Sequence, residues 1–386
     1  MVNAPFYSHA GAMARLAGVL VHQGHEVIVW GPEANRQQIE AFGARFEPHA
    51  PKLPTKVKGL ALAAGLAATT ERIAESLIAQ LHSHGVELLV RDNQTTWALV
   101  AGDYLGLPTV VSHPMFPLAG PGALPAKVRR AAAAARESEA DKQAAREQFD
   151  ASWLSIARRW GVEIGDINGV FHRTSEPTMA YTTEEIVGEN GLPTGWSCIG
   201  PLLAPGPTLQ HRAEPPLVYA CFGTSYNFRA DLFRAVIDAL GGRRVEVLIS
   251  TGKGKVKPAS LEPLPENVEI REFVPAREVL ARASVHITHG GCNSVHESLL
   301  AAVPMVCLPQ AFDQFPLSER VEQLGVGLNP GEGPAEIRDA VQGLLATAKA
   351  RERARELREH LRNYDGEARV AAVIEGALAE SAVIGG

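Results

Sequence analysis

The sequence predicts an α/β protein in which two doubly wound domains face each other across a central cleft. Three observations support this prediction. Short apolar strands alternate with amphipathic helices along most of the chain, a pattern typical of parallel sheets covered by helices. The length of 386 residues exceeds the roughly 250–300 residues at which a single hydrophobic core stops growing. Proline and glycine accumulate over residues 192–216, where they exclude a helix or a central strand and indicate a linker.

The first half of the chain has the pattern of one such domain with an insertion. Its apolar runs predict strands at 25–30, 86–90 and 109–112. Its helical periodicity predicts helices at 11–23, 34–43, 70–84 and 95–105. The charged helical stretch 125–160 interrupts the alternation, so we expect it to lie over one edge of the sheet.

After the linker the alternation begins again. Strands are predicted at 217–222, 245–251, 268–272, 285–288 and 305–308, with helices at 229–240, 276–282 and 294–302. We therefore expect an N-terminal domain over 1–200, a linker over 201–216 and a C-terminal domain over 217–365. A final helix over 366–386 is expected to pack back on the N-terminal domain. In open α/β sheets ligands bind beyond the carboxyl ends of the strands, so the site is sought in the loops there.

Composition excludes several classes of protein. The 37 basic and 43 acidic residues give a net charge of −6, which argues against a nucleic-acid surface or a polybasic membrane anchor. No apolar run approaches the roughly 18 residues of a membrane span, and no signal peptide is visible. The 4 cysteines are too few for a disulfide framework. These features predict a cytoplasmic protein.

The strongest motif runs from the strand 285–288 through two glycines into a helix. Glycines let a backbone approach a ligand closely, and the first turn of a helix presents free N–H groups and the positive end of its dipole. His289 would lie at the carboxyl end of the strand and could donate a hydrogen bond to a phosphate oxygen. Asn293 and Ser294 add side-chain donors. The segment therefore predicts an anion site.

Two other interpretations apply to the same residues. Ser294 and Glu297 have the spacing of a capping box, in which both side chains satisfy the helix N-terminus, and the motif taken alone does not separate cap from ligand site. A metal site at His286, His289, Cys292 and His296 is not predicted, because His286 and His289 lie three apart on a strand and point to opposite faces.

The same motif resembles the donor-binding signature of glycosyltransferase family 1, His-Gly-Gly-x-Asn-Ser-x-x-Glu. It is followed by Val-Pro-Met-Val at 303–306 and by Pro-Gln-Ala-Phe-Asp-Gln at 309–314. The resemblance is nearest to the bacterial macrolide and natural-product UDP-glycosyltransferases, and Gln-Gly-His-Glu-Val at 23–27 and Glu-Phe-Val-Pro at 272–275 extend it over nearly the whole chain. It implies the GT-B fold, with two Rossmann-like domains, and a nucleotide-sugar donor.

The resemblance implies a diphosphate site at the start of the helix in the motif. Glu297 would bond the hydroxyls of the ribose, because two carboxylate oxygens can face a vicinal diol. The residues implied to hold or adjoin the diphosphate are Thr224, His289, Gly291, Asn293 and Ser294.

The base and the sugar would occupy the two ends of the donor. Phe273 would stack on the base and Val274 would offer it backbone groups, while Asp313 and Gln314 would contact sugar hydroxyls. The chain has Phe273 where tryptophan is commoner and Ala276 where glutamine is usual, so uracil and thymine both stay open. The hydroxyl-bonding pair favours UDP-glucose over a TDP-deoxysugar.

The family's catalytic base is a histidine in a loop after the first strand, sixteen residues before the Gly-His turn. Here the turn contains His25, so the base would be His9, whose imidazole can take a proton from an acceptor hydroxyl near neutral pH. Asp92 follows the strand 86–90 and would orient His9, although it could instead cap the helix near Thr95. Few residues precede His9, so the first strand must be short.

The acceptor pocket is expected in loops of the first domain. Four residues suggest a hydrophobic acceptor such as a macrolide or another polyketide, although they fit a core equally well: Trp97, His113, Met115 and Phe116.

We therefore expect an inverting hexosyltransferase without a metal or other cofactor, since protein donors stabilise the leaving group and no Asp-x-Asp motif is present. The alternatives are a TDP-deoxysugar transferase, a catalytically silent nucleotide-sugar-binding protein and a sugar-nucleotide epimerase. The presence of both His9 and Asp92 argues against a silent protein. An epimerase needs additional carboxylates around the sugar, and no pair is placed for them.

Overall fold

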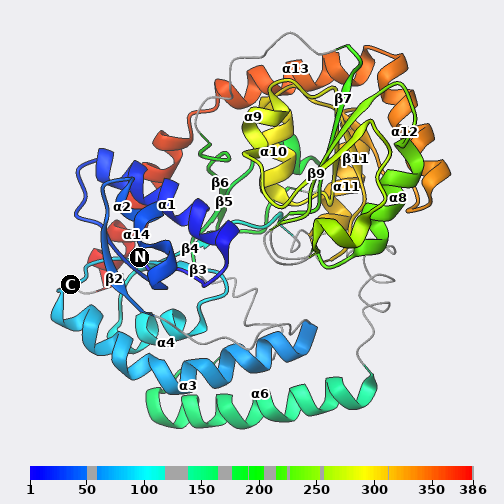
Figure 1. Ribbon diagram of the computed structural model, residues 1–386. Helices are drawn as coiled ribbons and strands as arrows, with labels where there is room; N and C mark the ends of the chain where they lie inside the picture. The colour runs from blue at the N-terminus through cyan, green and yellow to red at the C-terminus, as the bar shows by residue number, and fades with distance from the viewer. Residues whose placement is uncertain are drawn as a thin grey trace.

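The chain folds into two α/β domains with parallel sheets, as predicted (Figure 1). The structure is a computed structural model, and it describes residues 1–49, 59–117, 138–163, 176–189, 191–203, 214–223, 227–252, 256–311 and 313–384. None of the helices within these ranges is both long and apolar enough to cross a membrane.

The N-terminal domain is built on short parallel strands. They are β1 (Ile28–Gly31), β2 (Arg45–Pro48), β3 (Leu89–Asp92), β4 (Thr109–His113), β5 (Thr178–Ala180) and β6 (Trp196–Cys198). Strands β3, β4, β5 and β6 pair in that order, and β1 pairs with β2. The sequence did not predict β2, β5 or β6, which are only three or four residues long. Such short strands carry too few residues for alternation to be visible.

A single residue joins the two sets of strands. Val2 forms parallel bridges to Trp30 of β1 and to Arg91 of β3. Its N–H donates to the Val90 carbonyl at 2.8 Å, and its carbonyl accepts from the Asp92 N–H at 3.0 Å. The short first strand expected from the sequence is thus reduced to one bridged residue, which still directs the following segment to the carboxyl edge of the sheet.

Three of the long helices form a layer of their own. The helices of this domain are α1 (Tyr7–His22), η1 (Glu33–Asn35), α2 (Arg36–Glu40), α3 (Gly59–Ser83), α4 (Thr96–Leu105), α6 (Glu139–Trp160) and α7 (Glu184–Val187). Helix α3 packs against both α4 and α6, around buried side chains such as Leu66, Phe149 and Trp153. Figure 1 shows α6 running along α3 at the bottom of the molecule. The expectation that this stretch covers a sheet edge is therefore wrong, because the described part of it packs on a helix.

The C-terminal domain has one six-stranded parallel sheet in the order β12-β11-β10-β7-β8-β9. Its strands are β7 (Leu217–Cys221), β8 (Glu246–Ser250), β9 (Val268–Arg271), β10 (Val285–Thr288), β11 (Met305–Cys307) and β12 (Gly327–Leu328). The first five match predicted strands. The strands β7, β8, β10 and β11 are almost fully buried, which agrees with their apolar sequences, whereas β9 alternates apolar residues with exposed Glu269 and Arg271. Strands β7 and β10 are neighbours, which brings the loops after them together.

The helices of this part of the chain are α8 (Ala230–Leu240), η2 (Pro258–Leu261), α9 (Ala276–Leu280), α10 (Cys292–Leu300), α11 (Gln314–Gln323), α12 (Pro334–Ala346), α13 (Lys349–Arg362) and α14 (Gly366–Ile384). Helix α14 contacts α1, β4 and β6 of the N-terminal domain, and Figure 1 shows it beside α1. The domain boundaries themselves stay predictions. Strand β6 lies inside the proline- and glycine-rich run 192–216, which excludes a central strand but not an edge strand with one partner.

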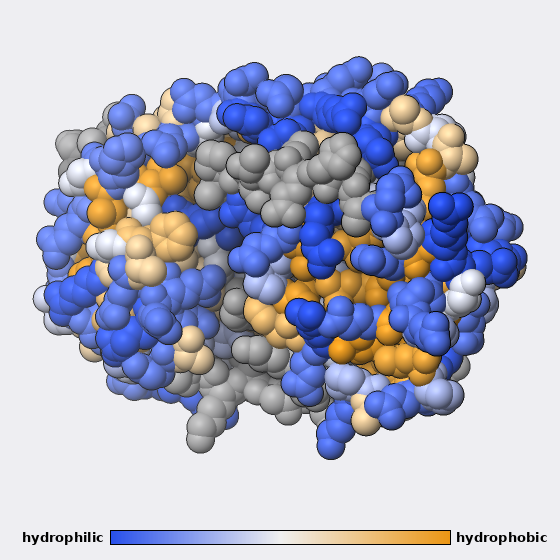
Figure 2. Space-filling view, turned by 45° about the horizontal axis from the view of Figure 1, so that its top comes forward, coloured by the Kyte–Doolittle hydropathy of each residue, from blue (hydrophilic) through white to orange (hydrophobic). Residues whose placement is uncertain are grey.

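A mixed hydrophobic cluster lies where the two domains meet. Phe116, Ile186 and Cys198 of the N-terminal domain are buried in one cluster with Val295 and Leu317 of the C-terminal domain. Figure 2 shows the two domains side by side on a mostly hydrophilic face, with hydrophobic residues gathered in a hollow on the C-terminal side. The shared cluster holds the two domains in contact.

A buried ion pair braces the N-terminal sheet. Arg91 of β3 donates from Nε to Glu176 Oε1 at 3.2 Å and from Nη2 to Glu176 Oε2, and the two side chains are only 3% and 10% exposed. Removing one member of such a pair leaves an uncompensated charge in the interior.

We therefore expect Glu176→Ala to lower the free energy of unfolding by about 3–5 kcal/mol, measured by urea denaturation. Glu269→Ala serves as the control, because its ion pair with Arg271 is 58% exposed on both sides and should contribute little. Equal losses from the two substitutions would contradict the prediction.

Candidate active site

The loop after β4 reaches across to the C-terminal domain. The Phe116 N–H donates to Asp313 Oδ2 at 2.9 Å, and the Cys292 thiol lies 4.0 Å from the Tyr181 carbonyl oxygen. These contacts join a residue predicted for the acceptor pocket to one predicted for the sugar. The carboxyl edges of the two sheets therefore face each other across a closed seam.

His9 and Asp92 form a hydrogen-bonded pair at this edge. His9 Nδ1 lies 2.8 Å from Asp92 Oδ2, and their side chains are 9% and 0% exposed. His9 lies in the first turn of α1, which begins at Tyr7, so its predicted location in a loop is wrong. The bridged residue Val2 and strand β3 bring the two side chains together from 83 residues apart in sequence.

The two interpretations of Asp92 both have a structural counterpart. Its Oδ1 accepts the Gln94 N–H at 2.9 Å, which stabilises the turn before α4. The N-cap of that helix is Thr95, not Asp92. One carboxylate oxygen thus supports the turn and the other holds His9.

The glycine-rich turn after β10 has the geometry of an anion site. Gly290 has φ +74°, a conformation that suits glycine, and Gly291 is the N-cap of α10 without a side-chain cap. The N-cap residue therefore supplies no side-chain acceptor to the first N–H groups of α10. Ser294 and Glu297 both lie inside the helix, so the capping-box interpretation is wrong. Asn293 is half-buried in the same first turn.

His289 lies between two glycines at the entrance to this turn. A Cβ atom on Gly223 would be 2.7 Å from its ring, and one on Gly291 would be 2.4 Å from Nε2, so both neighbours must lack a side chain. Burial lowers the pKa of His289 to about 4, so the ring is neutral near pH 7. Its Nδ1 is buried and has no partner among the described residues. A neutral imidazole can donate one hydrogen bond to a phosphate.

Glu297 lies one turn into α10, beside two cations. Burial raises the pKa of its carboxyl group, and the charges of Arg15 and Arg277 oppose that rise. Within the part of the chain that the structure describes, the carboxylate has no hydrogen bond or ion pair. It is available to a polar ligand.

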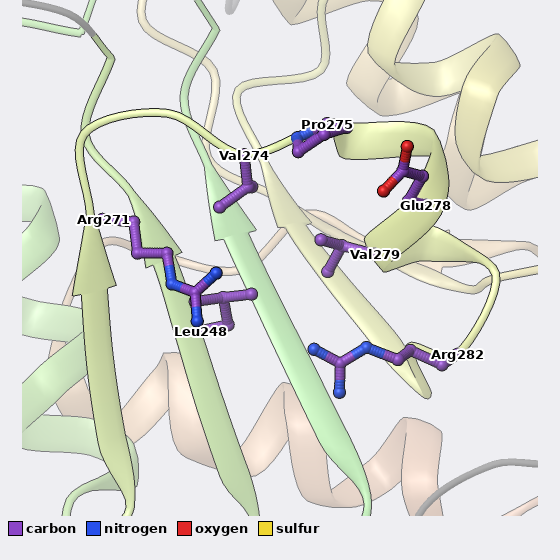
Figure 3. Close-up of a pocket in the computed structure, with 7 residues that line it drawn as sticks. All are labelled: Leu248, Arg271, Val274, Pro275, Glu278, Val279 and Arg282. Atoms are coloured by element: carbon purple, nitrogen blue, oxygen red, sulfur yellow. The ribbon is translucent and has the colours of Figure 1, made fainter.

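The loop predicted to bind the base of the nucleotide buries one of its two predicted contact residues and exposes the other. The Val274 side chain is buried against Leu248 and Val279, as Figure 3 shows, whereas Phe273 is 52% exposed. A cavity of about 260 Å³ lies behind this loop, lined by Leu248, Arg271, Val274, Pro275, Glu278, Val279 and Arg282. His9 and His289 do not line this cavity, whereas Val274, which is predicted to contact the nucleotide base, does.

Asp313 and Gln314 stand at the start of α11. Burial raises the pKa of Asp313 to about 6, against the effects of the Phe116 N–H and the charge of His9. The Gln314 Oε1 atom accepts the backbone N–H groups of Gln310 at 2.8 Å and Ala311 at 3.0 Å. The loop is thus organised before any sugar binds.

The residues predicted for the acceptor pocket divide into two groups. Trp97 is 0% exposed and lies in the core between α3, α4 and α6. Its assignment to the acceptor pocket is therefore wrong, and it is a core residue. Phe116 is likewise packed in the interdomain cluster. His113 Nδ1 lies 3.1 Å from the Met115 carbonyl oxygen, and Met115 is half-buried. Met115 therefore has the most accessible side chain of the four.

Two residues remain: Thr224, which the sequence predicted for the site, and Arg15, which it did not. Thr224 lies outside the described residues. Arg15, which the sequence analysis did not single out, has two buried nitrogens near α10. The signal was a cation within the otherwise uncharged apolar sequence of α1. No group of three or more metal-ligating side chains lies together in the described ranges.

Comparisons with known proteins agree with this architecture. The family described as "Erythromycin biosynthesis protein CIII-like, C-terminal domain" matches residues 234–375. The NDP-glycosyltransferase YjiC of Bacillus subtilis (strain 168) is 34% identical over 191 residues, which are 46% of this chain and 48% of that protein. The chain thus spans about half the length of this curated relative in the alignment.

Two further proteins align over the whole chain. The zeaxanthin glucosyltransferase of Pseudescherichia vulneris is 26% identical, covering 99% of this chain and 98% of its own. The crystal structure of the glycotransferase of kitacinnamycin superposes with a TM-score of 0.81 at 24% identity, with 98% of both chains covered, and shows the fold. These comparisons support the resemblance to glycosyltransferase family 1, and the superposition shows the GT-B fold. The fold predicted from the sequence is confirmed.

The buried histidines around the GT-B anion site predict a pH dependence of stability. Burial lowers the pKa of His286 to about 3 and of His296 to about 4, as for His289. Between about pH 4 and 6.5 the unfolded chain therefore binds more protons at these sites, and stability is lost as pH falls. Asp313, whose pKa is raised to about 6, and Glu297, whose pKa is also raised by burial, act in the opposite sense, but they are fewer than the histidines.

We expect the melting temperature to fall from pH 7 to pH 4.5, and His286→Gln to make that fall shallower. The substitution removes one titrating group while an amide can still bond Ser298, which lies 2.7 Å from His286 Nδ1. Scanning calorimetry at several pH values measures both slopes. Identical slopes for wild type and variant would exclude His286 as a contributor.

Proposed function

We propose that this protein is an inverting glycosyltransferase that moves a hexose from a nucleotide sugar to a hydroxyl of a hydrophobic natural product. The observation that carries the proposal is the His9–Asp92 pair on one side of the seam, with the His289 and α10 anion site on the other. A base and a leaving-group site on facing sheet edges are what a direct displacement at the anomeric carbon requires.

The hydrogen bond between His9 and Asp92 determines which nitrogen of His9 acts as the general base. Because Nδ1 faces a carboxylate oxygen at 2.8 Å, it carries the proton, and Nε2 is the basic nitrogen. Nε2 takes the proton of the acceptor hydroxyl as its oxygen attacks the anomeric carbon. Asp92 holds the ring orientation and stabilises the imidazolium that forms.

The leaving group is stabilised by groups of the C-terminal domain. As the bond from the anomeric carbon to the phosphate oxygen breaks, negative charge grows on the nucleoside diphosphate. Neutral His289 and the first N–H groups of α10 are donors placed for that charge. Glu297, whose carboxylate has no described partner, binds the ribose hydroxyls, and the exposed Phe273 stacks on the base.

UDP-glucose is our first choice of donor. Asp313 and the amide nitrogen of Gln314 supply a hydrogen-bond acceptor and a donor for sugar hydroxyls, since the Gln314 oxygen is already bonded in its loop. The named zeaxanthin glucosyltransferase supports both a glucosyl donor and an apolar acceptor. The acceptor would reach His9 past Met115, the accessible member of the loop after β4.

A screen of nucleotide sugars against hydroxylated polyketides, read by mass spectrometry, tests the proposal. A hexose-sized gain on an acceptor supports it. Donor hydrolysis in the absence of acceptor separates an active enzyme from a silent nucleotide-sugar-binding protein. Binding without transfer to any acceptor and without hydrolysis would favour the silent protein.

His9→Ala should lower the rate of transfer by on the order of 10²–10⁴-fold, because the general base is lost. Binding of the nucleoside diphosphate should be unchanged, since His9 faces the acceptor side. Asp92→Asn keeps the size of the side chain and should lower the rate less. Steady-state kinetics and calorimetry on both variants provide the measurement, and near wild-type turnover of His9→Ala would remove His9 from the mechanism.

UDP-glucose should bind about tenfold more tightly than its 2,6-dideoxy counterpart, the effect of roughly one hydrogen bond. Titration calorimetry with both sugars, and with the two TDP analogues, gives the preference for sugar and for base separately. Tighter binding of the dideoxy sugars would place the protein among deoxysugar transferases instead.

A further inference from the structure

Arg15 is a cation at the domain seam, and its buried nitrogens have no partner among the described residues. It lies on α1 between the buried residues Ala14 and Leu16. Its Nε and Nη2 atoms are buried, and neither has a hydrogen-bond acceptor in the part of the chain that the structure describes. Guanidinium groups are rarely buried without an acceptor, because lost hydration must be replaced.

The surroundings of Arg15 belong mainly to the predicted donor site. Its charge acts on Glu297, Cys292 and His296, which lie in the first two turns of α10, and on Tyr181 at the end of β5. No ion pair joins Arg15 to Glu297 among the described residues. A Cβ atom on Gly11 would lie 3.4 Å from Nη1, so the small residue one turn earlier leaves room for the guanidinium. Arg15 thus faces α10 from the N-terminal domain.

Glu297 lies near a second cation and near the start of its own helix. Arg277 at the start of α9 also acts on Glu297, so two guanidinium groups surround one carboxylate. The N-terminus of α10 adds the positive end of its dipole. Asp92 and Asp313 also bring carboxyl groups to the seam, so the unpartnered donors of Arg15, and not the net charge, favour an anionic ligand.

We propose that Arg15 is a donor-binding residue that contacts a phosphate oxygen of the nucleoside diphosphate from the N-terminal domain. This inference rests on the function proposed above and adds a contact from the opposite side of the seam. His289 and α10 hold the diphosphate from the C-terminal domain, and Arg15 completes its enclosure. Because charge on the diphosphate increases as the glycosidic bond breaks, the contact strengthens in the transition state and should affect kcat as well as binding.

The test compares UDP with uridine in titration calorimetry on wild type, Arg15→Gln and Arg15→Lys. Arg15→Gln should weaken UDP binding on the order of 10–100-fold, the effect of a charge-assisted hydrogen bond, and leave uridine binding unchanged. Arg15→Lys should be intermediate. Arg36→Gln is the matched control, because Arg36 pairs with Glu33 on the outer surface and should leave both ligands unaffected.

Thermal unfolding without ligand separates binding from a structural role. Since the buried charge has no partner, Arg15→Gln should keep or raise the melting temperature of the unliganded protein. A lowered melting temperature with equal loss of UDP and uridine binding would overturn the inference, as would wild-type UDP affinity in Arg15→Gln. If wild-type protein bound neither UDP nor TDP, the proposed function would fail and the inference with it, which is a different result from failure of the inference alone.

Discussion

The contact between the loop after β4 and the C-terminal domain determines the geometry of the whole site. Phe116 places its ring in the interdomain cluster, and its N–H bonds the carboxylate of Asp313 at 2.9 Å. Arg320 adds a bond from Nε to the Ile186 carbonyl at 3.0 Å on the same side. Apolar burial supplies the adhesion, while the directional bonds fix how the two sheet edges face. If this contact opened, the sheet edges that carry His9 and His289 would move apart.

Parallel topology explains why the chemical groups come from such distant parts of the sequence. Each sheet collects the carboxyl ends of its strands at one edge, so Asp92 at the end of β3 and His289 after β10 both reach the seam although they are far apart in the chain. The N-terminal sheet achieves this with very short strands and one bridged residue. Precision there depends on buried polar anchors, notably the pair of Arg91 with Glu176.

Much of this arrangement could be predicted from the sequence, and the exceptions have physical causes. Most strands of the C-terminal domain were visible as buried apolar runs, whereas the two-residue strand β12 was not predicted. The anion site was predicted from the spacing of the glycines and the helix start. Strands β2, β5 and β6 were missed because pairs with neighbouring strands, not local patterns, define such short segments. Trp97 was assigned to the acceptor pocket because an aromatic residue near a loop has the same sequence pattern in a core and in a pocket.

The polar groups left without partners follow a pattern that supports a binding site at the seam. Folded proteins satisfy most buried donors and acceptors, so each exception needs a reason. Several buried exceptions lie on segments around the predicted donor site, among them Arg15 at Nε and Nη2, His289 at Nδ1, His296 at Nε2 and Gln310 at Nε2. These four residues carry N–H groups or can do so, whereas Glu297 is the acceptor beside them. A ligand rich in anionic oxygens, with a few hydroxyl groups, would satisfy this set, and a nucleotide sugar has that chemistry.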